Sequence, residues 1–146
     1  VDAGGRFGMG DLHDNIKEIM NWGTMAAIFI GGGAGSVARW AMGVGVSKLT
    51  TFTPAGVLAA NVLATGILAG LIVWGGVKFS RESESLWMPL LVIGFCGGFS
   101  TFSTFSLDTF KLFQEGNFTW ALLNIIVSLV ACIGMAWALY AVVDKS

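Results

Sequence analysis

The sequence predicts an all-α integral membrane protein with four transmembrane helices, the third of them broken near its middle. Three observations predict this class. The 146-residue chain is 55% hydrophobic and only 12% charged, whereas soluble domains average about 25% charged residues. Its 21 glycines lie among Leu, Ile and Val, which is typical of closely packed membrane helices. Its apolar stretches reach or approach the roughly 20 residues that span a bilayer, so lipid is its expected solvent.

Four apolar segments define the expected spans. They cover about residues 25–46, 54–74, 86–113 and 118–143. Pro54 suits the first turn of a helix, and the later spans are separated by a polar loop at 80–85 and a Gly-Asn turn at 116–117. Tryptophans lie mostly near span ends, as expected for anchors at the headgroup level. Residues 22–146 therefore form a single four-helix membrane domain with both termini on one side.

Residues 1–21 form a polar N-terminal lead. Leu12, Ile16, Ile19 and Met20 recur at helical spacing and predict a short amphipathic helix, with a disordered tail as the alternative. The acidic residues of this lead and its lack of a small-residue cleavage site argue against a secretory signal. No function is assigned to it.

The basic residues give only a weak orientation signal. Arg6, Lys17, Lys78, Arg81 and Lys145 lie on the side of the termini, against Arg39, Lys48 and Lys111 on the other. Because cytoplasmic loops normally carry a clear excess of Lys and Arg, a bias this small permits insertion in both orientations. An antiparallel dimer of identical subunits is therefore permitted.

Composition and motifs exclude several classes of function. A formal net charge of −1 leaves no basic stripe for a phosphate backbone, so no nucleic-acid partner is expected. The only histidine, His13, lies in the polar lead, and the spans carry no paired carboxylates, so the protein is not expected to be an enzyme. Residues 31–35 are glycine-rich but lie inside an apolar helix, which favours close helix packing over phosphate binding. Cys96 and Cys132 are expected to be small apolar fillers.

The third span carries the most informative pattern. Five hydroxyl residues follow the double glycine Gly97-Gly98: Ser100, Thr101, Ser103, Thr104 and Ser106. A helix that restarts near Thr101 leaves amides without partners, which favour an anion, while the last carbonyls of the preceding half-helix can bind a cation. The alternative is that the glycines form a packing notch and the hydroxyls link neighbouring helices.

Each of the other polar or aromatic side chains in the spans has two possible interpretations. Phe102 and Phe105 stand three apart and share a helix face, so they either contact lipid and protein or turn electropositive ring edges toward an anion. Asn61, in the middle of the second span, either fastens helices together or donates to an anion.

Charged and weakly polar residues add further candidates. Arg39 either extends to the interface or draws anions by its positive field. Asp108 is expected to reach the interface. Asn124, Ser128 and Cys132 follow each other at intervals of four in the last span and form a weakly polar stripe.

With these residues in view, the chain resembles the Fluc family of fluoride channels, also called CrcB proteins, over about residues 25–143. The run from Gly94 to Ser106 is similar to the family signature Gly-Gly-x-[Ser/Thr]-Thr-Phe-Ser-Thr-Phe. Asn61, the segment 35–40 and Ser128 fall where the family pattern has them. The family often has tyrosine at the position of Asn124 and a second serine at that of Cys132, so the polar stripe differs here.

The resemblance implies a passive, fluoride-selective channel that exports fluoride across the plasma membrane, here the bacterial inner membrane, and so protects against fluoride toxicity. It also implies an antiparallel dual-topology homodimer with two pores. The rival function is that of a small proton-coupled multidrug exporter with four spans. Such an exporter needs a carboxylate deep in its first span, and this span has none.

The resemblance also implies a set of site residues. A structural Na⁺ at the dimer interface would be held by the backbone carbonyls of Gly97 and Ser100. Arg39 would lie near the aqueous mouth. The fluoride path would be lined by Asn61, Phe102, Phe105, Ser103, Thr104 and Ser128.

Overall fold

The computed structural model describes residues 21–74 and 86–143 of the chain. In those two ranges all regular structure is helical: α2 (Trp22–Ser47), α3 (Pro54–Trp74), η1 (Pro89–Cys96), α4 (Gly97–Phe99), α5 (Phe102–Gln114) and α6 (Phe118–Val143). The structure confirms the predicted all-α class and the bend in the third apolar segment. The predicted polar lead, except for residue 21, and the predicted loop at 80–85 lie outside the described residues.

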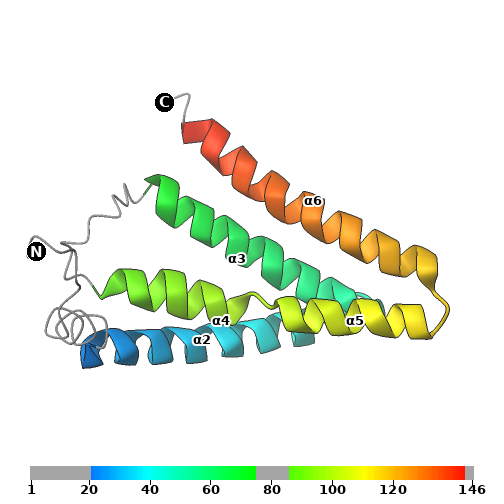
Figure 1. Ribbon diagram of the computed structural model, residues 1–146, viewed down its shortest axis with the longest axis horizontal. Coiled ribbons are helices and arrows are strands. Elements are labelled where there is room, and N and C mark those ends of the chain that lie inside the picture. The colour runs from blue at the N-terminus through cyan, green and yellow to red at the C-terminus, as the bar shows by residue number, and fades with distance from the viewer. Residues whose placement is uncertain (1–20, 75–85, 144–146) are drawn as a thin grey trace, which may run out of the picture.

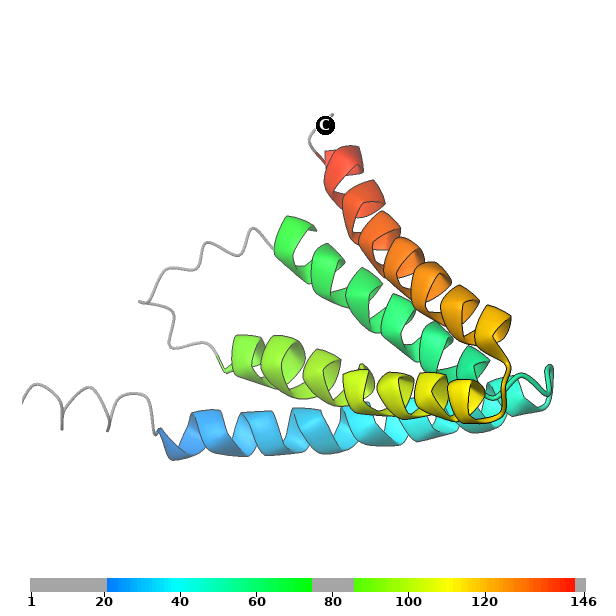
Figure 2. The same ribbon diagram turned by 45° about the vertical axis from the view of Figure 1, so that its right-hand side comes forward.

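The helices alternate in direction along the chain (Figure 1). α2 lies beside the half formed by η1 and α4, and α5 continues past the bend toward the opposite end of the molecule. α6 then returns beside α3, and Figure 2 shows both helices diverging from α2 toward the end of the molecule where α2 begins. The described helices therefore converge at the end where α5 turns into α6.

Three stretches of the described chain are long and apolar enough to cross a membrane. They are Pro54–Val73, Pro89–Gln114 and Phe118–Val142, the second of which contains the bend. α2 is not among them, although its 26 residues would extend about 39 Å at 1.5 Å per residue. Its glycines and Arg39 lower its hydropathy, so the predicted span at residues 25–46 stays a prediction.

Local sequence accounts for where the helices begin and end. The side chain of Asn21 caps α2 by accepting a hydrogen bond of 2.9 Å from the backbone N–H two residues on. α3 begins at Pro54, whose missing N–H costs nothing in a first turn. After α5 the chain turns at Gly116, whose φ of 76° suits glycine, and Asn117 N–H donates back to the Leu112 carbonyl at 2.9 Å.

A glycine seam joins α2 to the η1–α4 half, with Gly31 and Gly35 on one side and Gly94 and Gly98 on the other. A Cβ added at Gly35 would lie 2.8 Å from the Phe99 nitrogen, and one at each of the other three would likewise meet backbone atoms of the opposite segment. The two backbones are thus in direct contact, as small residues at intervals of four allow in membrane helices. The close-packing interpretation is confirmed at Gly31 and Gly35, and Gly98 belongs to the same seam.

The buried core of the described chain is small. Ala60 and Ala64 of α3 pack with Phe99 at the end of α4, and Phe95 covers this group. Most large apolar side chains remain exposed, including Phe29 at 83%. An apolar surface this extensive needs lipid or another protein surface to cover it.

Candidate functional site

The third apolar helix is interrupted at Ser100 and Thr101. Both have extended backbone, with φ −78° and ψ 158° at Ser100 and φ −154° and ψ 115° at Thr101. The helix resumes at Phe102, next to the predicted restart. Gly97 and Gly98 are themselves helical and precede the interruption. Extended backbone cannot continue the helical ladder, so the peptide groups at the break need other partners.

Asn61 of α3 supplies two of those partners. The Thr101 N–H donates to Asn61 Oδ1 at 2.7 Å, and Asn61 Nδ2 donates to the Thr101 carbonyl at 3.3 Å. One side-chain amide thus satisfies both backbone polar groups of the residue at the break. These contacts show Asn61 fastening α3 to the broken helix, and the second Nδ2 hydrogen remains for another acceptor.

The Thr101 side chain organises the start of α5. Its hydroxyl accepts a hydrogen bond of 3.2 Å from the Thr104 N–H and so caps the helix. The same oxygen lies 3.2 Å from Ser103 Oγ and 3.1 Å from Thr104 Oγ1. We call Thr101, Ser103 and Thr104 the hydroxyl cluster. Thr101 is only 7% exposed, so this cluster is anchored inside the protein.

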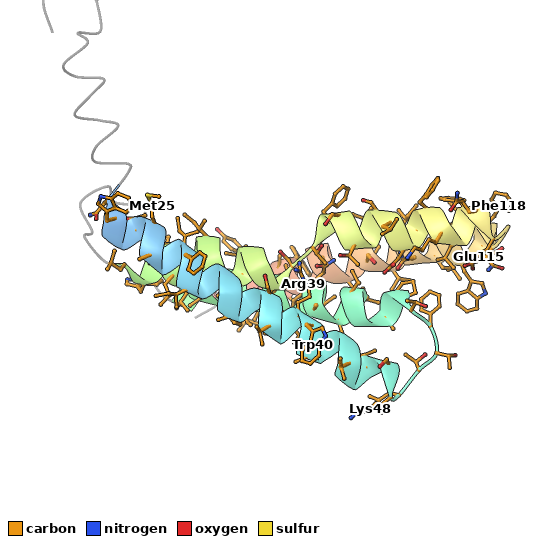
Figure 3. All side chains as sticks on the ribbon, turned by 90° about the horizontal axis from the view of Figure 1, so that it is seen from below. Met25, Arg39, Trp40, Lys48, Glu115 and Phe118 are labelled. Carbon is orange, nitrogen blue, oxygen red and sulfur yellow. The ribbon has the colours of Figure 1, made fainter. Side chains whose placement is uncertain are left out.

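The half-helix before the break ends in carbonyls that the helical ladder does not use. The Thr101 N–H, which would bond the Gly97 carbonyl in a continuous helix, donates to Asn61 instead. The Ser100 carbonyl accepts from Arg39 Nη1 at 3.3 Å, and Figure 3 shows Arg39 on α2 beside the junction of α4 and α5. The positive guanidinium therefore lies at the negative end of this half-helix, where a cation is stabilising.

A groove of about 480 Å³ opens between α2, the first turn of α3 and the break. It is lined by Ser36, Arg39, Trp40, Gly43, Val44, Ser47, Gly56, Val57, Thr101 and Thr104. Arg39 contributes positive charge and Thr104 a hydroxyl to this surface, while its small residues leave room beside them. The groove therefore combines a positive field with hydroxyl donors, which suits a small anion better than a cation.

Phe102 and Phe105 share one face of α5. Their ring centroids are 5.7 Å apart and their planes are inclined by 42°. Phe102 is 78% exposed and Phe105 is half-buried in the single chain. Ring edges carry the positive part of the aromatic quadrupole, so a pair of rings on one face can line a path for an anion.

A second set of buried polar groups lies between α5 and α6. Asn124 Nδ2 donates to Thr109 Oγ1 at 2.8 Å, and Thr109 Oγ1 donates to the Phe105 carbonyl at 2.8 Å. One turn further along α6, Ser128 is 7% exposed, and its hydroxyl has no hydrogen-bond partner among residues 21–74 and 86–143. A buried hydroxyl without a partner costs about 1–3 kcal/mol, so this position favours water or a polar ligand.

The structure brings together most of the residues that the sequence assigned to the site, and it adds two. Asn61, Ser100, Ser103 and Thr104 meet around the break, and Arg39 joins them from α2. Thr101 and Thr109 were missed as site residues. Thr101 carries the ordinary signal of an N-cap, a hydroxyl residue immediately before a helix. Asp108, which is expected to reach the interface, is 8% exposed in the described chain, and its neighbour Thr109 is 7% exposed.

Comparison with known proteins places the chain among similar sequences. The family model described as CrcB-like protein, Camphor Resistance (CrcB) matches residues 26–140. Proteins named fluoride-specific ion channel FluC, from Escherichia fergusonii, Escherichia coli O139:H28 and Escherichia coli O9:H4, are each 44% identical over 113 residues. The aligned region covers 76% of this chain and 86% of each relative.

Proposed function

This chain belongs to the CrcB-like protein family, and on that premise we propose that it is a fluoride-specific ion channel in which the helix break forms part of the conduction path. It is not an enzyme. The observation that carries the proposal is the interruption of an apolar helix at Ser100 and Thr101, surrounded by hydroxyls, an amide and a guanidinium. Irregular backbone at membrane depth is tolerated only where protein or a hydrated cavity satisfies it, so such a break is typical of an ion site.

The chemistry of the lining suits fluoride. Fluoride is small and strongly hydrated, so a pore must replace its water with closely spaced donors. The free Nδ2 hydrogen of Asn61 and the hydroxyls of Ser103, Thr104 and Ser128 are the donors we assign to the path. The ring edges of Phe102 and Phe105 add weaker positive potential along it.

Arg39 is assigned to the entrance of this path. It lines the groove and lies beside the break, where its charge raises the local concentration of anions. Conduction is passive in this proposal, so fluoride leaves the cell down its gradient across the plasma membrane, and the cell is protected from fluoride toxicity.

We extend the proposal to an antiparallel dual-topology homodimer with two pores. The support is the surface of the single chain, on which Phe102 is 78% exposed and a Cβ at Gly97 would meet no atom within 4 Å. A second copy packed on this face would enclose the ring pair and the end of α4. The weak charge bias of the sequence permits the two opposite insertions that such a dimer requires.

We also propose that Na⁺ is held at the dimer interface by the Gly97 and Ser100 carbonyls. The donor set fits, because unwound carbonyls at the end of a half-helix are typical ligands for Na⁺. The Thr101 N–H does not reach the Gly97 carbonyl, and the Ser100 carbonyl keeps one lone pair beyond its bond to Arg39. Among the described residues no group of three or more His, Cys, Asp or Glu side chains could hold a metal, so backbone oxygens are the ligands expected. Such an ion supplies positive charge at the break when bound.

Reconstitution in liposomes tests the function. The purified protein is expected to release trapped fluoride, measured with a fluoride electrode, and to pass little chloride, measured with a chloride electrode under the same gradient. Empty liposomes are the control. Proton-coupled export of organic cations without fluoride flux would instead support the multidrug-exporter alternative, which the carboxylate-free sequence of α2 does not favour.

A further inference from the structure

The Thr101 hydroxyl makes more hydrogen-bond contacts than its role as a helix cap requires. Its oxygen accepts from the Thr104 N–H at 3.2 Å and also contacts the hydroxyls of Ser103 and Thr104. A hydroxyl has one hydrogen and two acceptor lone pairs. The N–H takes one lone pair, which leaves one lone pair and one hydrogen for the two neighbouring hydroxyls.

This count allows only two complete arrangements of the hydroxyl cluster. In the first, Thr104 donates to Thr101 and Thr101 donates to Ser103, so the Ser103 hydrogen is free. In the second, Ser103 donates to Thr101 and Thr101 donates to Thr104, so the Thr104 hydrogen is free. Both arrangements satisfy Thr101 completely, and each leaves one hydroxyl hydrogen available to an anion.

The two free positions face different surroundings. Thr104 lines the groove together with Arg39, whereas Ser103 is not part of that lining and is exposed on the single chain. Rotation of the Thr101 hydroxyl therefore exchanges which hydroxyl has the free hydrogen, Thr104 in the groove or Ser103 outside it. The backbone contacts of the protein stay unbroken. Hydroxyl rotation is a fast side-chain motion, and Asn61 holds the Thr101 backbone in place while it occurs.

From this geometry we infer that Thr101 is a positioning residue for fluoride conduction, whose hydroxyl passes hydrogen-bond donation between Thr104 in the groove and Ser103 beyond it. The inference rests on the proposed function. An anion at the groove would be met by Thr104, and an anion at the next position by Ser103. Charge-assisted hydrogen bonds of this kind are stronger than bonds between neutral groups, so the anion itself would select the arrangement that faces it.

Three substitutions at one position separate the relay from the helix cap. Thr101→Val keeps the shape but removes both functions. Thr101→Asn keeps an acceptor for the Thr104 N–H, since Asn is among the best N-caps, but its amide oxygen and nitrogen cannot exchange donor and acceptor roles at one atom. Thr101→Ser keeps the hydroxyl and both functions. Ser106→Ala is the matched control, because Ser106 lies on the same helix and donates only to the Phe102 carbonyl at 2.9 Å.

The measurements are fluoride efflux from liposomes and the thermal midpoint of the purified protein in detergent. We expect Thr101→Asn to keep the midpoint within a few degrees of the unsubstituted protein while its efflux falls about tenfold or more. Thr101→Val should lose efflux to the same extent with a lower midpoint, and Thr101→Ser and Ser106→Ala should conduct normally. If Thr101→Val does not fold, Thr101→Asn alone decides the question.

Normal efflux through Thr101→Asn would overturn the relay and leave Thr101 as a cap. Loss of efflux in Ser106→Ala equal to that in Thr101→Asn would also overturn it, because any missing hydroxyl would then have the same effect. The proposed function fails separately, through absence of fluoride efflux from the unsubstituted protein. The two failures are therefore distinguishable in one set of liposomes.

Discussion

At the scale of single residues, the site is built from a few polar groups that each have more than one partner. The side chain of Asn61 bonds both backbone groups of Thr101, and Thr109 both accepts from Asn124 and donates to the Phe105 carbonyl. Buried polar groups stabilise a protein only when their hydrogen bonds are satisfied. Removing one partner should therefore lower the free energy of unfolding by more than the energy of the hydrogen bond, because the other partner is left unsatisfied.

Replacing Asn61 by Ala tests this reasoning. The substitution leaves the Thr101 N–H and carbonyl without partners, and each unsatisfied buried group costs about 1–3 kcal/mol. We expect the free energy of unfolding in detergent to fall by about 2–6 kcal/mol. Asn117→Ala is the matched control, because Asn117 is exposed and its side chain bonds only the exposed Glu115 at 3.2 Å; it should change stability by less than about 0.5 kcal/mol. Equal effects of the two substitutions would contradict the fastening role of Asn61.

The aromatic pair gives a second prediction at this scale. Isoleucine retains apolar bulk but has no quadrupole, so Phe102→Ile and Phe105→Ile should each abolish most fluoride flux while the protein stays assembled. Liposome efflux measures the first effect and size-exclusion chromatography the second. Phe110→Ile is the control, since Phe110 is a further exposed phenylalanine of α5 that we do not place on the path. Normal flux in both variants would remove the rings from the mechanism.

At the scale of elements, backbone contact between helices decides where Arg39 and the break lie. The glycine seam brings α2 against the η1–α4 half closely enough for Arg39 to reach the Ser100 carbonyl. The η1 segment is a π-helix of eight residues, a rare conformation that is frequent at functional sites. The small residues of the sequence thus determine, through the seam, where Arg39 lies at the site.

Gly35→Ala tests the seam. The added methyl group would lie 2.8 Å from the Phe99 nitrogen, and backbone atoms on both sides cannot move apart without separating the helices. Overpacking of this kind typically costs about 1–3 kcal/mol, which we expect as a lower thermal midpoint in detergent together with reduced fluoride efflux. Gly33→Ala is the control within the same helix, because a Cβ there meets no atom within 4 Å, and its midpoint should not fall. A tolerated Gly35→Ala would show that the seam is looser than the structure indicates.

At the scale of the whole molecule, the chain buries very little of its own apolar surface. No large side chain among residues 21–74 and 86–143 is fully buried, and exposed Trp, Phe, Ile and Leu residues occur on α2, α3, α5 and α6. Lipid and a second copy of the chain are the environments that can cover such a surface. Stability should accordingly depend on assembly and on any ion held between the copies.

Removing sodium tests the assembly. If Na⁺ binds the folded dimer and not the unfolded chain, stability rises with the logarithm of its concentration above the dissociation constant. We therefore expect the thermal midpoint in detergent to fall when NaCl is replaced by N-methyl-D-glucamine chloride. Equal ionic strength keeps screening constant, and choline chloride provides a second sodium-free control. A midpoint that is independent of sodium would contradict the proposed ion.

The sequence alone determined the helical class, the positions of the apolar segments, the break before α5 and the family. The first three follow from composition and local periodicity, because lipid permits few kinds of backbone and a double glycine followed by hydroxyls is a strong local signal. The family came from the resemblance of residues 94–106 to a known signature. The tertiary structure decided which groups meet. Asn61 and Thr101 are 40 residues apart in the chain. Gly35 is separated by about 60 residues from Phe95 and Phe99, whose backbone atoms lie against it. Such pairings depend on how α2 and α3 pack against the broken helix, which no local pattern specifies, and they made Thr101 the centre of the site.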